Sequence, residues 1–107
     1  MADLVAIATD MVKACIAQDW DRAYAQADVK FVRGFTEFMN AQAWTRVKML
    51  CGNLRSIGKA QEYRHLLGPI RTVFLDCQFE RLLVVVEVSF TLEDRIVGLA
   101  MRTPGFA

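Results

Sequence analysis

Hydrophobic side chains recur every three or four positions in the first half of the chain. This is the period of an amphipathic helix with one buried face. It predicts a helix at Leu4–Ile16, a short helix at Asp19–Ala27, and a third helix that begins at Asn40 and that Gly52 ends. The segment 28–38 is weakly patterned, and no element is predicted there.

After Gly52 apolar residues alternate with polar ones, and the β-branched content rises. The alternation predicts four strands, at 54–59, 70–79, 82–92 and 95–101. Residues 60–67 fit a helix or a strand equally well. The expected fold class is therefore α+β, with N-terminal helices packed on a curved antiparallel sheet of about four strands, in a single domain that spans residues 1–107.

The strand pattern also predicts how the strands pair. Turns centred on 80–81 and 93–94 place apolar residues opposite each other on one face, in the pairs Cys77–Val84, Leu75–Val86, Val73–Val88 and Phe90–Val97. The other face is mixed: Thr72, Phe74, Asp76, Gln78, Leu83, Val85, Glu87, Ser89, Thr91, Ile96 and Arg102. Because side chains alternate, a slip of one residue exchanges the two faces.

The charge balance excludes two classes of partner. Thirteen Lys and Arg against 12 Asp and Glu give a net charge of +1, without a block of like charge. A basic surface for nucleic acid or for an acidic membrane is therefore not expected.

No stretch approaches the ~20 apolar residues of a membrane span. The three cysteines, Cys15, Cys51 and Cys77, lie on apolar faces, which indicates reduced core thiols and a cytoplasmic protein.

Motifs for catalysis or cofactor binding do not occur in the sequence. His65 is the single histidine, and Glu62 is its one nearby potential ligand, so a zinc site is not expected. Asp10 lies opposite the apolar stripe of its helix, as a solvated carboxylate does. Neither a phosphate-binding glycine loop, nor a nucleophile elbow, nor a closely spaced cysteine pair is present. We therefore assign no catalytic residue, no metal and no cofactor.

Several core and turn positions carry a resemblance to a known superfamily: Asp19-Trp20 with Ala23-Tyr24, Trp44 eight residues before Gly52, and the ending Asp94-Arg95-Ile96-Val97-Gly98-Leu99. With these positions and the order of its elements, the chain resembles the nuclear transport factor 2-like superfamily over nearly its whole length. It is most similar to small bacterial domains of unknown function. Cystatin-like sequences share this layout.

The resemblance implies a cone-shaped roll with a pocket at its open end and frequent homodimers. Some relatives isomerise steroids or hydrolyse epoxides with inward-pointing Asp residues and a Tyr. The predicted inner face of this chain offers Val, Leu, Phe and Cys instead. No catalytic residue is therefore carried over.

The leading hypothesis for function is a non-catalytic domain that binds a small apolar or amphipathic molecule. Tyr24, Phe31, Trp44 and Phe90 are the predicted lining residues of its pocket. Apolar pockets with one or two polar groups suit such ligands. Simple core packing of the same aromatic side chains is the competing interpretation, since aromatic residues at helical spacing more often belong to a core.

Two alternatives depend on which side chains the outer face of the sheet carries. In the first, the chain is a homodimer whose interface contains Phe74, Asp76, Leu83, Val85, Glu87 and Ile96. Its competitor is a monomer in which the segment 28–38 folds over that face. In the second, the protein is an isomerase or hydrolase, which requires Asp76 or Glu87 to face a cavity instead.

Overall fold

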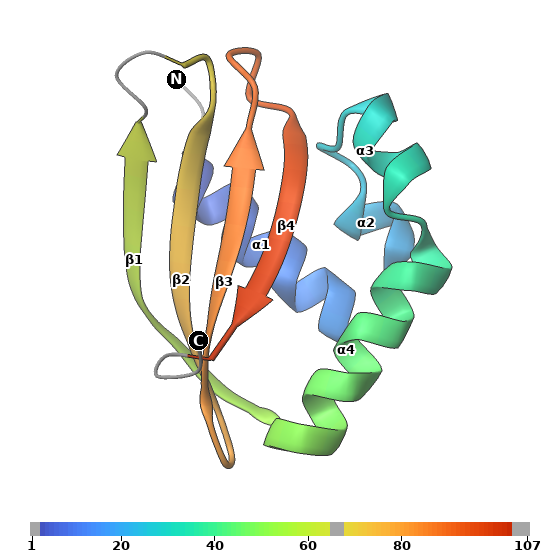
Figure 1. Cartoon of the computed structure of the whole chain (residues 1–107), viewed down its shortest axis with the longest axis vertical. Coiled ribbons are helices and arrows are strands. Elements are labelled where there is room, and N and C mark those ends of the chain that lie inside the picture. The colour runs from blue at the N-terminus through green and yellow to red at the C-terminus, as the bar shows by residue number, and fades with distance from the viewer. Residues whose placement is uncertain (1–2, 65–67, 104–107) are drawn as a thin grey trace.

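The computed structural model describes residues 3–64 and 68–103, in which helices precede strands. The elements are α1 Leu4–Ile16, α2 Trp20–Ala23, α3 Val29–Gly34, α4 Glu37–Cys51, β1 Leu54–Arg64, β2 Arg71–Phe79, β3 Leu83–Phe90 and β4 Ile96–Arg102. The strands form one antiparallel sheet in the order β1-β2-β3-β4. Figure 1 shows α1 behind the sheet and α4 beyond β4, and the expected α+β class is confirmed.

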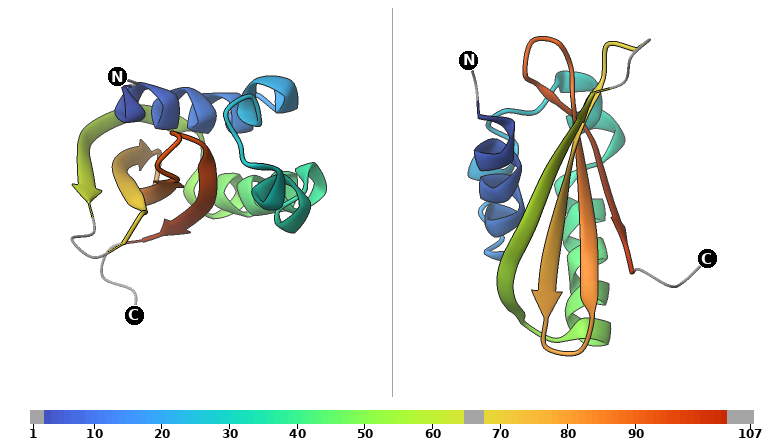
Figure 2. Two further views of the ribbon diagram at one scale, coloured as in Figure 1. Left: turned by 90° about the horizontal axis from the view of Figure 1, so that it is seen from above. Right: turned by 90° about the vertical axis from the view of Figure 1, so that its left-hand side faces the viewer.

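Helix α1 has the predicted bounds, and its N-terminus is capped by Asp3. The Asp3 carboxylate accepts a hydrogen bond of 3.1 Å from the Ala6 amide, one of the amides that the first turn leaves free. The apolar stripe of α1 packs on the inner face of the sheet, where α1 contacts β1 and β2. Seen from above, α1 runs along the inside of the curved sheet (Figure 2).

The other helices differ from the predicted ones in their bounds. Helix α4 begins at Glu37 rather than at Asn40, because the Thr36 hydroxyl is the cap and accepts from the Met39 amide at 3.4 Å. The unassigned segment contains α3, which Asp28 caps in the same way. Helix α2 ends at Ala23, four residues early. The residues that follow it form a turn, which leads to a parallel bridge between Ala27 and Ile96.

The pairing of β2 with β3 confirms the predicted register. Cys77 lies opposite Val84, Leu75 opposite Val86 and Val73 opposite Val88, and all six side chains are buried. Strand β1 continues to Arg64, so the ambiguous residues 60–64 are strand. Residues 65–67, which include His65, lie outside the described part of the chain.

The register of β3 with β4 is right from Val85 to Ser89 and wrong at Phe90. A shift of one residue occurs after Ser89, so that Phe90 pairs with Ile96 and not with Val97. A bulge of this kind reverses which side chains face the core. Ile96 is therefore 1% exposed inside the core, and its predicted place on the outer face is wrong. Arg102 keeps its predicted outer side, and Gly98 and Ala100 lie on that side too.

Candidate functional site

The four predicted pocket residues do not line one cavity. Phe90 is fully buried in the core, and Phe31 and Trp44 border two different hollows. Tyr24 lies between these hollows and is half-buried. The structure therefore separates the predicted pocket into a polar cluster, an open groove and a small cleft.

The polar cluster joins the ends of the helices. The Tyr24 hydroxyl donates a hydrogen bond of 2.6 Å to the Phe35 carbonyl and accepts one of 3.1 Å from the Asn40 side-chain amide. The same amide contacts the Cys15 sulfur at 3.5 Å. Burial raises the pKa of the Tyr24 hydroxyl, so the group is a proton donor at neutral pH. Its hydrogen bonds are used within the fold, which favours a structural role for Tyr24.

Asn40 is the residue of this cluster that the sequence analysis did not expect in the core. It is 0% exposed and its Oδ1 atom has no hydrogen-bond partner. Its position four residues before Trp44, on the buried stripe of α4, is the signal that could have placed it in the core. The sequence analysis instead began a helix at Asn40, a position where the side chain would be exposed to solvent.

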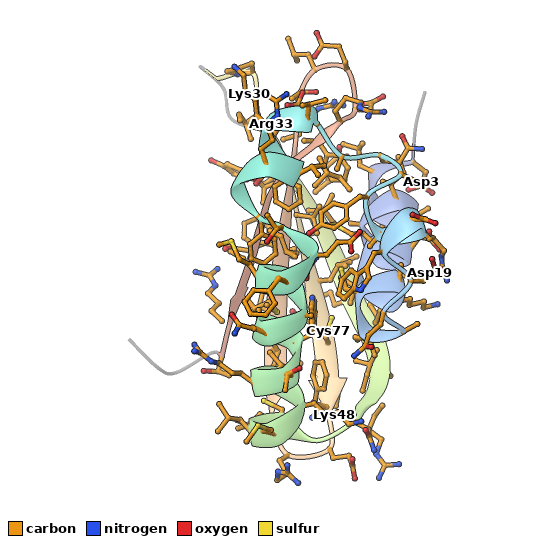
Figure 3. All side chains as sticks on the ribbon, turned by 90° about the vertical axis from the view of Figure 1, so that its right-hand side faces the viewer. Asp3, Asp19, Lys30, Arg33, Lys48 and Cys77 are labelled. Carbon is orange, nitrogen blue, oxygen red and sulfur yellow. The ribbon has the colours of Figure 1, made fainter. Side chains whose placement is uncertain are left out.

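The open groove lies between α3 and β4 and has a volume of about 600 Å³. Phe31 and Phe35 form its helix side, and their ring centroids are 5.7 Å apart. Leu99 belongs to its strand side, and Lys30 and Asp28 lie at its margin. In Figure 3, Lys30 and Arg33 are seen on α3, above α4. The carboxylate of Asp28 caps α3 by accepting from the Lys30 amide at 2.9 Å.

The small cleft lies between α1, α4 and the beginning of β1, and its volume is about 130 Å³. Trp44, Leu54 and Phe79 contribute apolar surface to it, and Cys15 lies on its α1 side. Burial raises the pKa of the Cys15 thiol to about 11, so the thiol is protonated at neutral pH. Of the lining residues, Trp44 is the only one that the sequence prediction had placed in a pocket.

The outer face of the sheet carries five of the six predicted interface residues. Phe74, Leu83, Val85, Asp76 and Glu87 are all half-buried, and none of the described helices lies over them (Figure 1). Arg102 of β4 pairs with Glu87 at 3.3 Å and places its guanidinium 5.9 Å from the centre of the Phe74 ring. The hydroxyls of Thr72 and Ser89 are 3.2 Å apart. This face is a mixed apolar and charged surface.

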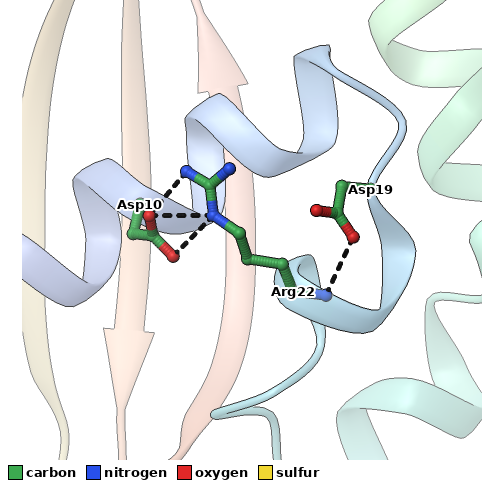
Figure 4. Close-up of polar contacts among 3 residues, drawn as sticks. All are labelled: Asp10, Asp19 and Arg22. Atoms are coloured by element: carbon green, nitrogen blue, oxygen red, sulfur yellow. Dashed lines mark hydrogen bonds and ion pairs between the residues drawn. The ribbon is translucent and has the colours of Figure 1, made fainter.

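The carboxylates considered in the sequence analysis lie on the outer sheet face or in an ion pair between two helices. Asp76 and Glu87 are on the outer face, as the register predicted. Asp10 is exposed and forms a bidentate ion pair with Arg22, which ties α1 to α2, and Asp19 caps α2 (Figure 4). Within the described residues, no group of three or more His, Cys, Asp or Glu could hold a metal ion. None of the described helices is both long and apolar enough to cross a membrane.

Comparison of the chain with family models, with curated proteins and with solved structures found no match. The resemblance to the nuclear transport factor 2-like superfamily stays a prediction.

Proposed function

We propose that the chain is a homodimeric interaction module in which the outer sheet faces of two copies pack against each other. The observation that supports this proposal is a helix-free sheet face with Phe74, Leu83 and Val85 half-buried on it. Monomers rarely leave a contiguous apolar patch of more than a few hundred Å² uncovered. Burying such a patch against a second copy removes it from water.

The charges on this face favour a second copy over another partner. Glu87 and Arg102 carry opposite charges on neighbouring strands, and Asp76 lies two strands from Arg102. A two-fold axis brings the same patch of both copies together, so Arg102 of one copy can approach an acidic side chain of the other. A stable dimer needs ~800 Å² per partner, and the whole chain has 6773 Å² of surface.

The competing interpretation was a monomer in which the segment 28–38 covers this face. That segment instead forms α3 and the start of α4, on the far side of β4. Its backbone is held there, because the Asp28 amide donates to the Ile96 carbonyl at 2.8 Å. The segment therefore leaves the outer face open.

Sedimentation of the Val85→Glu variant tests the dimer. Val85 lies directly between Asp76 and Arg102 in the sheet, so the neighbouring charges offset each other and the monomer can accept the carboxylate. In a dimer the same carboxylate would lose its water, at a cost of several kcal/mol. We expect wild type to sediment as a dimer at micromolar concentration and Val85→Glu as a folded monomer.

The matched control is Val29→Glu. Val29 is 60% exposed on α3, away from the sheet, and a carboxylate suits the first turn of a helix. We expect this variant to remain dimeric. Sedimentation of wild type as a single species of 12.1 kDa would overturn the proposal.

A small-molecule binding function is the second candidate, and the α3–β4 groove is the observation that favours it. Phe31, one of the predicted pocket residues, lies in this groove of about 600 Å³. That volume is within the range of ligand pockets, ~300–1,000 Å³. A rise in melting temperature with a member of a metabolite panel, lost in Phe31→Ala, would support this candidate. An isomerase or hydrolase would further need a carboxylate of raised pKa in a cavity, and Asp76 and Glu87 are on the outer face.

A further inference from the structure

The cleft between α1, α4 and the start of β1 has the size of a single small molecule. Its volume is about 130 Å³, close to that of an engineered apolar cavity of about 150 Å³ that takes up benzene. Ile16, Trp44, Leu54 and Phe79 give it mainly apolar walls. One aromatic ring or a short branched chain therefore fits.

Two of the polar groups that line this cleft can only donate hydrogen bonds, those of Trp44 and Lys48. Trp44 is 6% exposed, and its indole N–H interacts with the Cys15 sulfur but has no hydrogen-bond partner of normal geometry. Lys48 follows one turn later on α4 (Figure 3). It also lines the cleft. An indole nitrogen and an ammonium group can donate but cannot accept. The group that satisfies both is therefore an acceptor, and the charge of Lys48 favours an anionic one.

The acidic group nearest to the described lining, Glu80, is held by partners outside the cleft. None of its lining residues is acidic. Glu80, beyond the Gly52–Asn53 turn, accepts from the Asn53 amide at 2.7 Å and pairs with Arg55 at 3.4 Å. The Cys15 thiol is protonated, because burial raises its pKa to about 11. Lys48 is thus the one charged residue among those that line the cleft.

We propose that this cleft binds a small monocarboxylate whose apolar part is one ring or a short branched chain. The apolar part lies against Trp44, Leu54 and Phe79, and the carboxylate accepts from the Trp44 indole and from Lys48. The cleft lies between helices α1 and α4 and the buried Phe79 of β2, so the site does not depend on the proposed dimer.

Titration with benzoate, followed by two-dimensional ¹H–¹⁵N NMR, tests the site. The chain has two tryptophans, and Trp20 does not line the cleft, so its indole N–H signal is an internal reference. We expect benzoate to shift the Trp44 indole signal in a saturable way and to leave the Trp20 signal in place. Benzyl alcohol, which has the same ring without the charge, should bind more weakly.

Two variants test whether benzoate binds in this cleft through its charge, rather than at any apolar surface through its ring. Lys48→Gln keeps the length of the side chain and removes its charge, and we expect benzoate affinity to fall roughly two- to fivefold. Lys59→Gln, an exposed lysine on β1, is the control and should leave affinity unchanged. Ala41→Leu should fill the cleft and abolish binding.

Three results would overturn the proposal. The first is an unshifted Trp44 signal at millimolar benzoate. The second is equal affinity for benzoate and benzyl alcohol in wild type and in Lys48→Gln, because the charge then has no role. The third is undiminished binding in Ala41→Leu, which would place the ligand elsewhere. The oligomeric state is measured separately, so a failure here leaves the dimer proposal unaffected.

Discussion

The thiols of Cys15 and Cys77 are core groups whose ionisation is coupled to folding. They are 1% and 0% exposed, and burial raises the pKa of each to about 11 from an ordinary value of 9.0. The folded state therefore favours the protonated thiol, whereas the unfolded state ionises first. The resulting stability is fully present below pH 9 and is lost as the pH rises from 9 to about 11.

We accordingly predict a decline of the free energy of unfolding between pH 9 and pH 11, on the order of 2 kcal/mol for each thiol. Urea unfolding across this range measures the decline. Cys77→Ala should show a smaller decline than wild type, because one of the two thiols is gone. Equal declines in the two proteins would contradict the assignment to Cys77, since all other titrating groups are shared.

At the scale of the elements, the sequence predicted those parts of the fold that repeated patterns define. The alternation along β2 and β3 determined the register, because only one pairing buries all six residues from Val73 to Val88. The bulge after Ser89 was missed, since it depends on the Thr91–Asp94 turn. Arg71 holds that turn by donating to the Thr91 carbonyl and pairing with Asp94, and a contact from another strand leaves no periodic signal.

The end of α4 is an element boundary where the sequence prediction was right for a reason that can be tested. Gly52 has φ = +84°, a conformation that side chains strongly disfavour. A Cβ atom at this position would also lie 2.8 Å from the Glu80 Cβ. A side chain at position 52 is therefore disfavoured twice, by the backbone conformation and by the close approach of Glu80.

We predict that Gly52→Ala lowers the free energy of unfolding by about 2–4 kcal/mol. Gly34→Ala is the matched control, because a Cβ at Gly34 meets nothing within 4 Å and α3 is helical there. We expect this control to be neutral or to gain up to ~1 kcal/mol from helix propensity. Urea titration of both variants makes the comparison. Equal stability of the two would show that the backbone at Gly52 is not constrained.

At the scale of the whole molecule, the sequence identified surfaces better than cavities. The outer face follows from strand alternation alone, and five of the six predicted interface residues lie there. A cavity depends on how separate elements pack, and no period in the chain encodes that packing. Tyr24 and Trp44 were expected in one pocket, yet one ends in a hydrogen-bonded cluster with Asn40 and the other borders a cleft.

The dimer proposal also predicts how the stability of the whole molecule responds to concentration. When unfolding separates two chains, mass action raises the melting temperature with protein concentration. A tenfold increase contributes about 1.4 kcal/mol per dimer, or roughly 3 °C for two chains of this size. A monomer melts at the same temperature at every concentration.

We therefore expect the melting temperature of wild type and of Val29→Glu to rise by about 3 °C for each tenfold increase in concentration. Calorimetry over a hundredfold range is sufficient to measure this slope. The melting temperature of Val85→Glu should be independent of concentration, because its carboxylate prevents the sheet faces from meeting. A slope of zero in wild type would show that the outer face remains exposed to water. A slope that Val85→Glu retains would instead place the interface on another surface, such as the exposed side of α4, where Met49 and Leu50 are 74% and 70% exposed.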